Sequence, residues 1–103
     1  GSKVEPGDTV SVDYVGKLLD GKEFDKSTPG HPLVFQEGVG MVIPGFDEAL
    51  EYLKEGSKAT IIIPSSLGYG PQGIKKPGED SYAIPPSAVL VFDIDVLKVT
   101  KTK

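Results

Sequence analysis

The chain has 103 residues, which suits one domain that buries roughly 65% of the surface exposed by its unfolded form, and leaves little room for two. Hydrophobic residues make up 38% of it, and 15 acidic side chains outnumber 11 basic ones, for a net charge of −4. This balance excludes a disordered chain and argues against nucleic-acid binding, which needs a positive face for phosphate contacts.

The sequence carries no sign of a membrane or a covalent framework. No apolar run approaches the roughly 20 residues of a membrane span, so we expect neither a span nor a signal peptide. The absence of cysteine excludes disulfides and zinc–thiolate sites but fits either redox compartment, which leaves the location open. Gly1 and Ser2 are interpreted as a cloning scar, and 3–103 as a single domain.

Three short strands are predicted in the first third of the chain. Apolar and polar side chains alternate over 9–18, which is the period of a half-buried strand. Asp20 and Gly21 then predict a type I′ turn, in which both central residues have positive φ. We expect 22–25 to pair back as the second strand of this hairpin, and 33–36 to form a third.

One helix is predicted, beginning near Pro44. Apolar residues there change to helical spacing, at Phe46, Ala49, Leu50 and Leu53. Proline near the start and Gly56 just past the end agree with the preferences of helix termini.

The second half of the chain predicts two more strands around an irregular segment. Residues 58–63 have few polar side chains on either face of the predicted strand, so this strand should be central in the sheet. Prolines and glycines exclude a helix over 64–87. Residues 89–99 alternate again and predict a long strand with one face in the core. The fold expected is α+β, an antiparallel sheet wrapped on one short helix.

Several isolated signals carry no chemistry of their own. Residues 68–73 match a dinucleotide fingerprint, but Pro71 denies the helix that this motif must open. His31 lies in a predicted turn with no nucleophile spaced to use it, so we expect an exposed loop side chain. Asp93 and Asp95 share one face of a strand, which predicts a solvated outer face more than a cation site.

Five short motifs, in this order, resemble those of the FKBP-type peptidyl-prolyl isomerases, the macrolide-binding immunophilins. The resemblance extends from about residue 4 to residue 99, nearly the whole chain. Each motif alone is weak, whereas five with compatible spacing are specific. They are Tyr14-Val15-Gly16, Gly21 to Ser27, Val42 to Phe46, Leu67 to Gly70, and Ile84-Pro85-Pro86 followed by Leu90 to Asp93.

The resemblance implies a five- or six-stranded half-barrel around the helix, with an apolar pocket between helix and sheet. It implies an isomerase that needs no cofactor and no metal, that acts as a monomer, and that takes proline-containing peptides or unfolded protein clients. Macrolides such as rapamycin would bind in the same pocket. Carried over position by position, the pocket lining is Tyr14, Phe24, Asp25, Leu33, Phe35, Val42, Ile43, Phe46, Tyr69, Ile84 and Phe92.

Within this implied site, Tyr14, Phe24, Asp25 and Tyr69 are the catalytic candidates, and the other seven residues would bind the substrate or macrolide. Rotation about the amide breaks its resonance without a nucleophile, so a dry apolar pocket that favours the twisted, less polar state is sufficient. The Tyr69 hydroxyl and the Ile84 N–H would hold peptide carbonyls. Asp25 would either orient the twisted carbonyl or satisfy a local hydrogen bond.

The chain departs from the family pattern at three places. Phe46 stands where the family often has tryptophan, and Leu33 replaces a frequent aromatic residue. The segment between Tyr69 and Ile84 is longer than in minimal members, which predicts an overhanging flap. This flap favours an alternative function, a proline-directed binding or folding-helper module with low turnover. A purely structural domain is the third reading.

Overall fold

The structure, a computed structural model, describes residues 2–101. Gly1 of the interpreted cloning scar and the last two residues of the predicted domain lie outside this range. The elements in chain order are β1 (Thr9–Leu18), β2 (Glu23–Lys26), β3 (Leu33–Gln36), α1 (Pro44–Leu50), β4 (Lys58–Ile63), a 3-10 turn (Ser65–Leu67), β5 (Ile74–Lys75), β6 (Tyr82–Ile84) and β7 (Leu90–Thr100).

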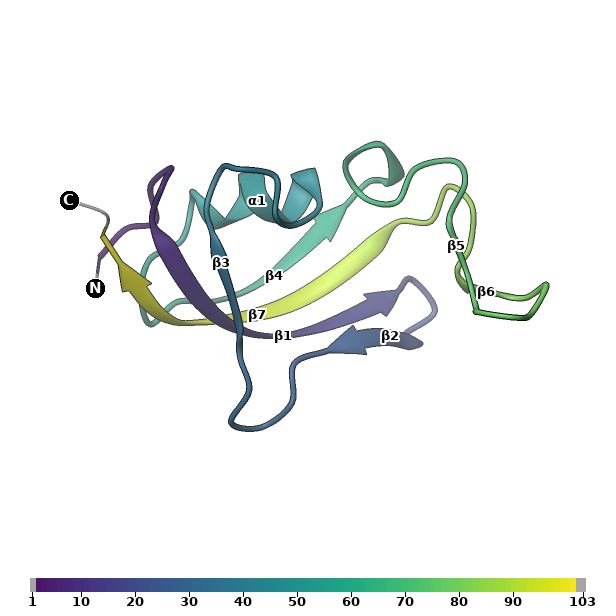
Figure 1. Ribbon diagram of the computed structural model, residues 1–103, viewed down its shortest axis with the longest axis horizontal. Helices are drawn as coiled ribbons and strands as arrows, with labels where there is room; N and C mark the ends of the chain where they lie inside the picture. The colour runs from purple at the N-terminus through teal and green to yellow at the C-terminus, as the bar shows by residue number, and fades with distance from the viewer. Residues whose placement is uncertain (1, 102–103) are drawn as a thin grey trace.

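Five of the strands form one open antiparallel sheet. Its order is β2-β1-β7-β4, and β3 also pairs with β1. The sheet curves around α1, which covers one of its faces (Figure 1). The predicted α+β half-barrel with one short helix is therefore confirmed, with five strands in the main sheet.

The prediction that 58–63 is a central strand is wrong. Within the described residues β4 pairs with β7 alone, so it lies at an edge, while β1 and β7 are central. Its inward side chains pack toward the core, but Ile62 on the outer face is 68% exposed. The strand has few polar residues because an apolar side chain is exposed on its outer face, and not because both of its faces are buried.

The predicted hairpin between β1 and β2 is present, but its turn is not type I′. Gly21 has φ +90°, whereas Asp20 does not have positive φ. Instead the Asp20 carboxylate accepts the Lys22 N–H at 2.9 Å, and the Leu18 N–H donates to the Lys22 carbonyl at 2.9 Å. The aspartate therefore stabilises this turn through its side chain.

The helix is shorter than its apolar spacing predicts. It ends at Leu50, and Leu53 lies beyond it in a turn whose N–H groups bond three residues back, Leu53 to the Leu50 carbonyl at 3.0 Å. Gly56 belongs to the next turn, where its N–H donates to the Val96 carbonyl at 2.8 Å. As predicted, no α-helix forms over 64–87. The prediction did not include the 3-10 turn at Ser65–Leu67.

The core lies between α1 and the inward face of the sheet. Gly45 lets the helix approach β4 closely, because a Cβ atom there would lie 2.5 Å from Ile63 Cγ2. The β5–β6 hairpin projects beyond this core at one end of the molecule, which measures 46 × 26 × 23 Å (Figure 1). Over residues 2–101, no helix combines the length and apolarity of a membrane span.

Candidate functional site

A cluster of aromatic rings occupies the space between α1 and the inward face of the sheet. Phe46 of α1 is at its centre, and its ring meets three others edge to face, at centroid distances of 5.3 Å to Phe92, 5.7 Å to Phe35 and 6.1 Å to Tyr14. Phe24 of β2 meets Phe92 in the same way at 5.6 Å. This is the favoured geometry for aromatic pairs. We call these five rings the ring cluster.

Polar groups lie at the exposed margin of the ring cluster. The Tyr14 hydroxyl donates to Asp25 Oδ2 at 2.8 Å, and Asp25 Oδ1 accepts the Lys26 N–H at 2.8 Å. Burial, followed by this hydrogen bond, raises the pKa of Tyr14 to about 12, so it stays a donor at neutral pH. Burial and then the charge of Asp25 also raise the pKa of Tyr69.

The ten apolar and aromatic residues of the predicted site belong to one hydrophobic cluster or pack against it. Four are buried, with 2 to 5% of their surface exposed: Phe35, Phe46, Ile84 and Phe92. Six are half-buried: Tyr14, Phe24, Leu33, Val42, Ile43 and Tyr69. Asp25 is exposed. The structure thus brings segments far apart in the sequence into one apolar region with a single carboxylate at its edge.

The backbones of Ile84 and Ile43 lie in different elements near the ring cluster. Ile84 lies in β6, in register with Ile74 of β5. Ile43 caps α1, where its carbonyl accepts the Phe46 N–H at 3.0 Å, while its own N–H has no acceptor within the described residues. The sequence analysis considered only the Ile43 side chain. Pro44 at the helix start is the signal that identifies this free donor, because the first N–H groups of a helix lack partners.

Gly16 lies against the ring cluster. It belongs to the Tyr14-Val15-Gly16 motif, but no role was predicted for it. A Cβ atom on it would lie 2.8 Å from both Phe24 Cζ and Phe92 Cε1. Only a glycine lets the two rings approach β1 this closely. The detectable signal was a glycine inside a strand, which often marks a close approach.

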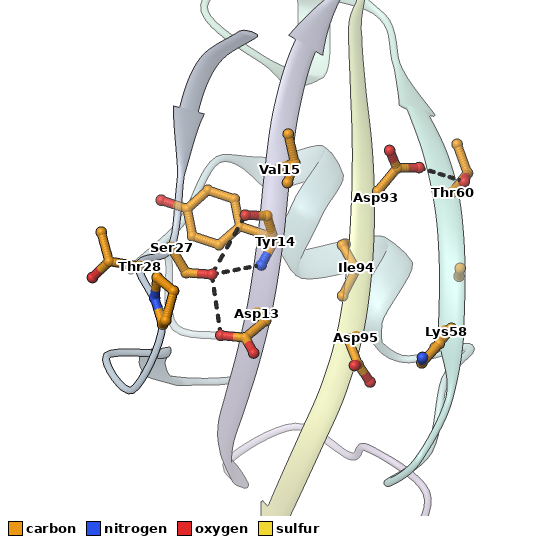
Figure 2. Close-up of a pocket in the computed structure, with 12 residues that line it drawn as sticks. Asp13, Tyr14, Val15, Ser27, Thr28, Lys58, Thr60, Asp93, Ile94 and Asp95 are labelled. Carbon is orange, nitrogen blue, oxygen red and sulfur yellow. Dashed lines mark hydrogen bonds between the residues drawn. The ribbon is translucent and has the colours of Figure 1, made fainter.

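A hollow of about 680 Å³ lies on the face of the sheet opposite α1. Figure 2 views it with α1 behind the strands. We call it the outer hollow, and its side chains include Asp13, Ser27, Lys58, Thr60 and Asp95. It contains none of the phenylalanine rings, and Tyr14 is the one residue of the ring cluster that also lines it.

Several of the polar groups that line the outer hollow are hydrogen-bonded. Thr60 Oγ1 donates to Asp93 Oδ1 at 2.6 Å, and Lys17 Nζ lies 3.3 Å from Asp93 Oδ2. These two interactions lower the pKa of Asp93. The Ser27 hydroxyl donates to Asp13 Oδ1 at 3.1 Å (Figure 2). Among residues 2–101 no three acidic or histidine side chains are arranged to hold a metal ion.

The outer-face prediction for the β7 aspartates is confirmed, since Asp93 and Asp95 both line the outer hollow. His31 lies exposed in the loop before β3, where its N–H donates to the Thr28 carbonyl at 2.9 Å. Neither region contributes to the ring cluster.

Comparison with known proteins agrees with this geometry. Residues 1–97 match the family model of the FKBP-type peptidyl-prolyl cis-trans isomerases. The chain is 43% identical to the isomerase FKBP2 of Mus musculus, over 96% of this chain and 67% of that protein. It is 46% identical to FkpA of Escherichia coli K12, of which it spans 34%.

The fold of the chain is also similar to that of a solved structure. The crystal structure of AtFKBP13 superposes with a TM-score of 0.86 at 40% identity, covering 95% of this chain and 83% of that one. With the antiparallel sheet around one helix and the family match over most of the chain, the resemblance inferred from five motifs is confirmed. The chain belongs to the FKBP-type peptidyl-prolyl cis-trans isomerase family.

Proposed function

We propose that the ring cluster is the isomerase site and that it receives the proline ring of an Xaa-Pro peptide. The observation that carries this proposal is the arrangement around Phe46: three rings meet it edge to face, and the Tyr14 hydroxyl and Asp25 carboxylate lie at the margin. An apolar floor with polar groups only at the rim suits a substrate that is half ring and half amide.

The chemistry requires no nucleophile, acid or base. The barrier of roughly 18–20 kcal/mol comes from amide resonance, and the twisted state is less polar than the planar one. A pocket of rings with little water therefore binds the twisted state more tightly than the ground state, which is the condition for catalysis. Half-buried Val42 and Ile43 form the proposed rim above the rings.

Backbone and hydroxyl donors at the rim would hold the peptide carbonyls. The Tyr69 hydroxyl is one, and the Ile84 N–H is the second that the family resemblance suggested. The free Ile43 N–H supports a further assignment, because it is half-buried at the helix start and has no acceptor within residues 2–101. A bound carbonyl would satisfy it.

For Asp25, the contacts favour a positioning role. Both of its oxygens already accept hydrogen bonds, one from the Tyr14 hydroxyl and one from the Lys26 N–H. Asp25 would thus fix the Tyr14 ring against Phe46, and its charge would add to the field at the rotating carbonyl. The alternative, direct orientation of that carbonyl by Asp25 alone, predicts that Tyr14→Phe leaves activity unchanged.

The test is the rate of cis–trans isomerisation of a short Xaa-Pro peptide. We expect the protein to accelerate it, and rapamycin to inhibit by occupying the same site. An unchanged rate relative to buffer would reject the isomerase site. The partners proposed are proline-containing peptides, unfolded clients and macrolides, and the chain is proposed to act as a monomer.

The β5–β6 hairpin supports a second candidate, a proline-binding or folding-helper module with low turnover. It projects from the end of the molecule and carries exposed Ile74 and Lys75, the latter 5.8 Å from the Tyr82 ring centroid (Figure 1). Such a surface can hold a client beside the ring cluster. Peptide binding without acceleration would favour this function over catalysis.

A further inference from the structure

The carboxylate of Glu37 is buried without a hydrogen-bond donor. The residue directly follows β3 and is 0% exposed, and neither of its carboxylate oxygens accepts a hydrogen bond from an N–H or hydroxyl donor within residues 2–101. Its backbone, in contrast, is satisfied, since its N–H donates to the Asp8 carbonyl at 2.8 Å and its carbonyl accepts the Gly7 N–H at 2.9 Å. An ionised carboxylate held this way loses its hydration without compensation.

The charged groups that face Glu37 are themselves acidic. They are Asp47 of α1 and Glu51, the residue that caps the C-terminus of this helix. Burial first, and then the charge and hydrogen bonding of these two carboxyls, raise the pKa of Glu37 to about 8. From the segment before β1, Asp8 offers its carbonyl, while its carboxylate pairs with Lys101 Nζ at 2.8 Å. Because no cation among residues 2–101 forms an ion pair with Glu37, a proton is the remaining means of neutralising it.

Asp47 connects this buried group to the proposed rim of the site. Its Oδ1 accepts the Gly38 N–H at 2.7 Å and its Oδ2 accepts the Gly40 N–H at 3.3 Å. These two bonds hold the 38–43 segment against α1. Because that segment ends at Val42 and Ile43, the position of the rim depends on the Asp47 carboxylate.

We propose that protonated Glu37 donates a hydrogen bond to the carboxylates of α1, and that Glu37 and Asp47 together position the 38–43 segment relative to Phe46. Without that proton, three negative charges would face one another beside the core, and the segment would separate from the helix. Substrate binding would weaken while the rings stayed in place. The effect on catalysis rests on the proposed function, whereas the state of Glu37 does not.

The first test is independent of catalysis and follows Glu37 directly. Its carboxyl carbon, observed by NMR, should titrate with a midpoint near 8, and not near the 4.5 of a free glutamate. Because the unfolded chain releases this proton first, the free energy of unfolding should fall as the pH rises from about 4.5 through about 8. In Glu37→Gln, whose amide donates at every pH, this fall should disappear.

The matched control is Glu48→Gln, which removes the same charge from an exposed position of the same helix. It should keep the pH dependence of the unmodified protein. A Glu37 midpoint near 4.5, or a Glu37→Gln variant whose stability falls with pH as before, would overturn the inference even if the protein is an active isomerase.

The second test separates KM from kcat for an Xaa-Pro peptide on both sides of pH 8. The KM of the unmodified protein should rise several-fold above this pH with a smaller change in kcat, and Glu37→Gln should abolish the rise. Asp47→Asn, which replaces one of the two oxygens that accept the Gly38 and Gly40 N–H groups by an NH₂ donor, should raise KM at every pH. A KM unaffected by Asp47→Asn refutes the positioning role, while no catalysis by any variant rejects the proposed function and leaves the NMR result to decide on Glu37.

Discussion

The two faces of the sheet are built from alternate residues of the same strands, yet they provide opposite environments. On β7, Phe92 points toward α1 and joins the ring cluster, while the neighbouring Asp93 lines the outer hollow together with Thr60. The outer hollow encloses about 680 Å³, but its lining includes the charged side chains of Asp13, Lys58, Asp93 and Asp95. Hollow volume alone therefore does not identify the site. The chemistry of the lining does, because a twisted amide needs an apolar environment and not a polar one.

The largest expected effect comes from removing the centre of the ring cluster. Phe46→Ala should destabilise the fold by about 3–5 kcal/mol and abolish measurable isomerisation, since a buried ring and its three partners are lost. Urea unfolding and the peptide assay measure the two effects.

The matched control is Leu50→Ala on the same helix, also fully buried but outside the ring cluster. It should cost about 2–5 kcal/mol while keeping most of the activity of the folded protein. Equal loss of activity in both variants would contradict the distinction. Phe46→Leu, which leaves less empty volume, extends the comparison if the alanine variant does not fold.

The next effect tests Gly16, where an added methyl group must displace rings. Gly16→Ala should cost about 1–3 kcal/mol through overpacking and reduce kcat/KM several-fold, because the methyl would press on Phe24 and Phe92. Gly45→Ala is the control, since it creates a clash with Ile63 away from the rings. We expect it to lower stability with little loss of activity in the folded protein.

A smaller effect concerns the hydrogen bond at the margin of the ring cluster. Tyr14→Phe and Asp25→Asn should each lower kcat/KM, and the double variant should lose less than the sum of the two. A coupling of about 0.5–1.5 kcal/mol is expected for a single hydrogen bond in water. Additive losses would indicate that Asp25 acts on the substrate independently of Tyr14.

The smallest effect is expected on the outer face. Thr60→Val removes the 2.6 Å hydrogen bond that helps to lower the pKa of Asp93. A lowered pKa contributes stability that is present above the unfolded value of 3.8 and is lost as the pH falls through the folded value. The variant should thus unfold at slightly higher pH during acid titration, with unchanged isomerase activity. A large loss of activity would assign function to the outer hollow.

Much of the fold and the site was predictable because the relevant signals are local. Alternation over 9–18 and 89–99 predicts strands β1 and β7, and helical spacing around Phe46 predicts α1. These patterns report only which side chains share a face. They could not show that β4 lies at an edge, since strand order depends on which distant segments pair. Nor could they show the Asp20 side-chain bond that replaces the predicted turn type.

The sequence by itself determined the family, through five motifs in order, and the alternation that divides apolar from polar side chains along each strand. Only the tertiary structure decided that Gly16 lets two rings approach the backbone closely, that Tyr14 donates to Asp25, and that Glu37 is buried among other carboxyls. The physical reason is that side-chain direction is a local property of the backbone, whereas desolvation and hydrogen-bond partners depend on contacts between residues far apart in the chain.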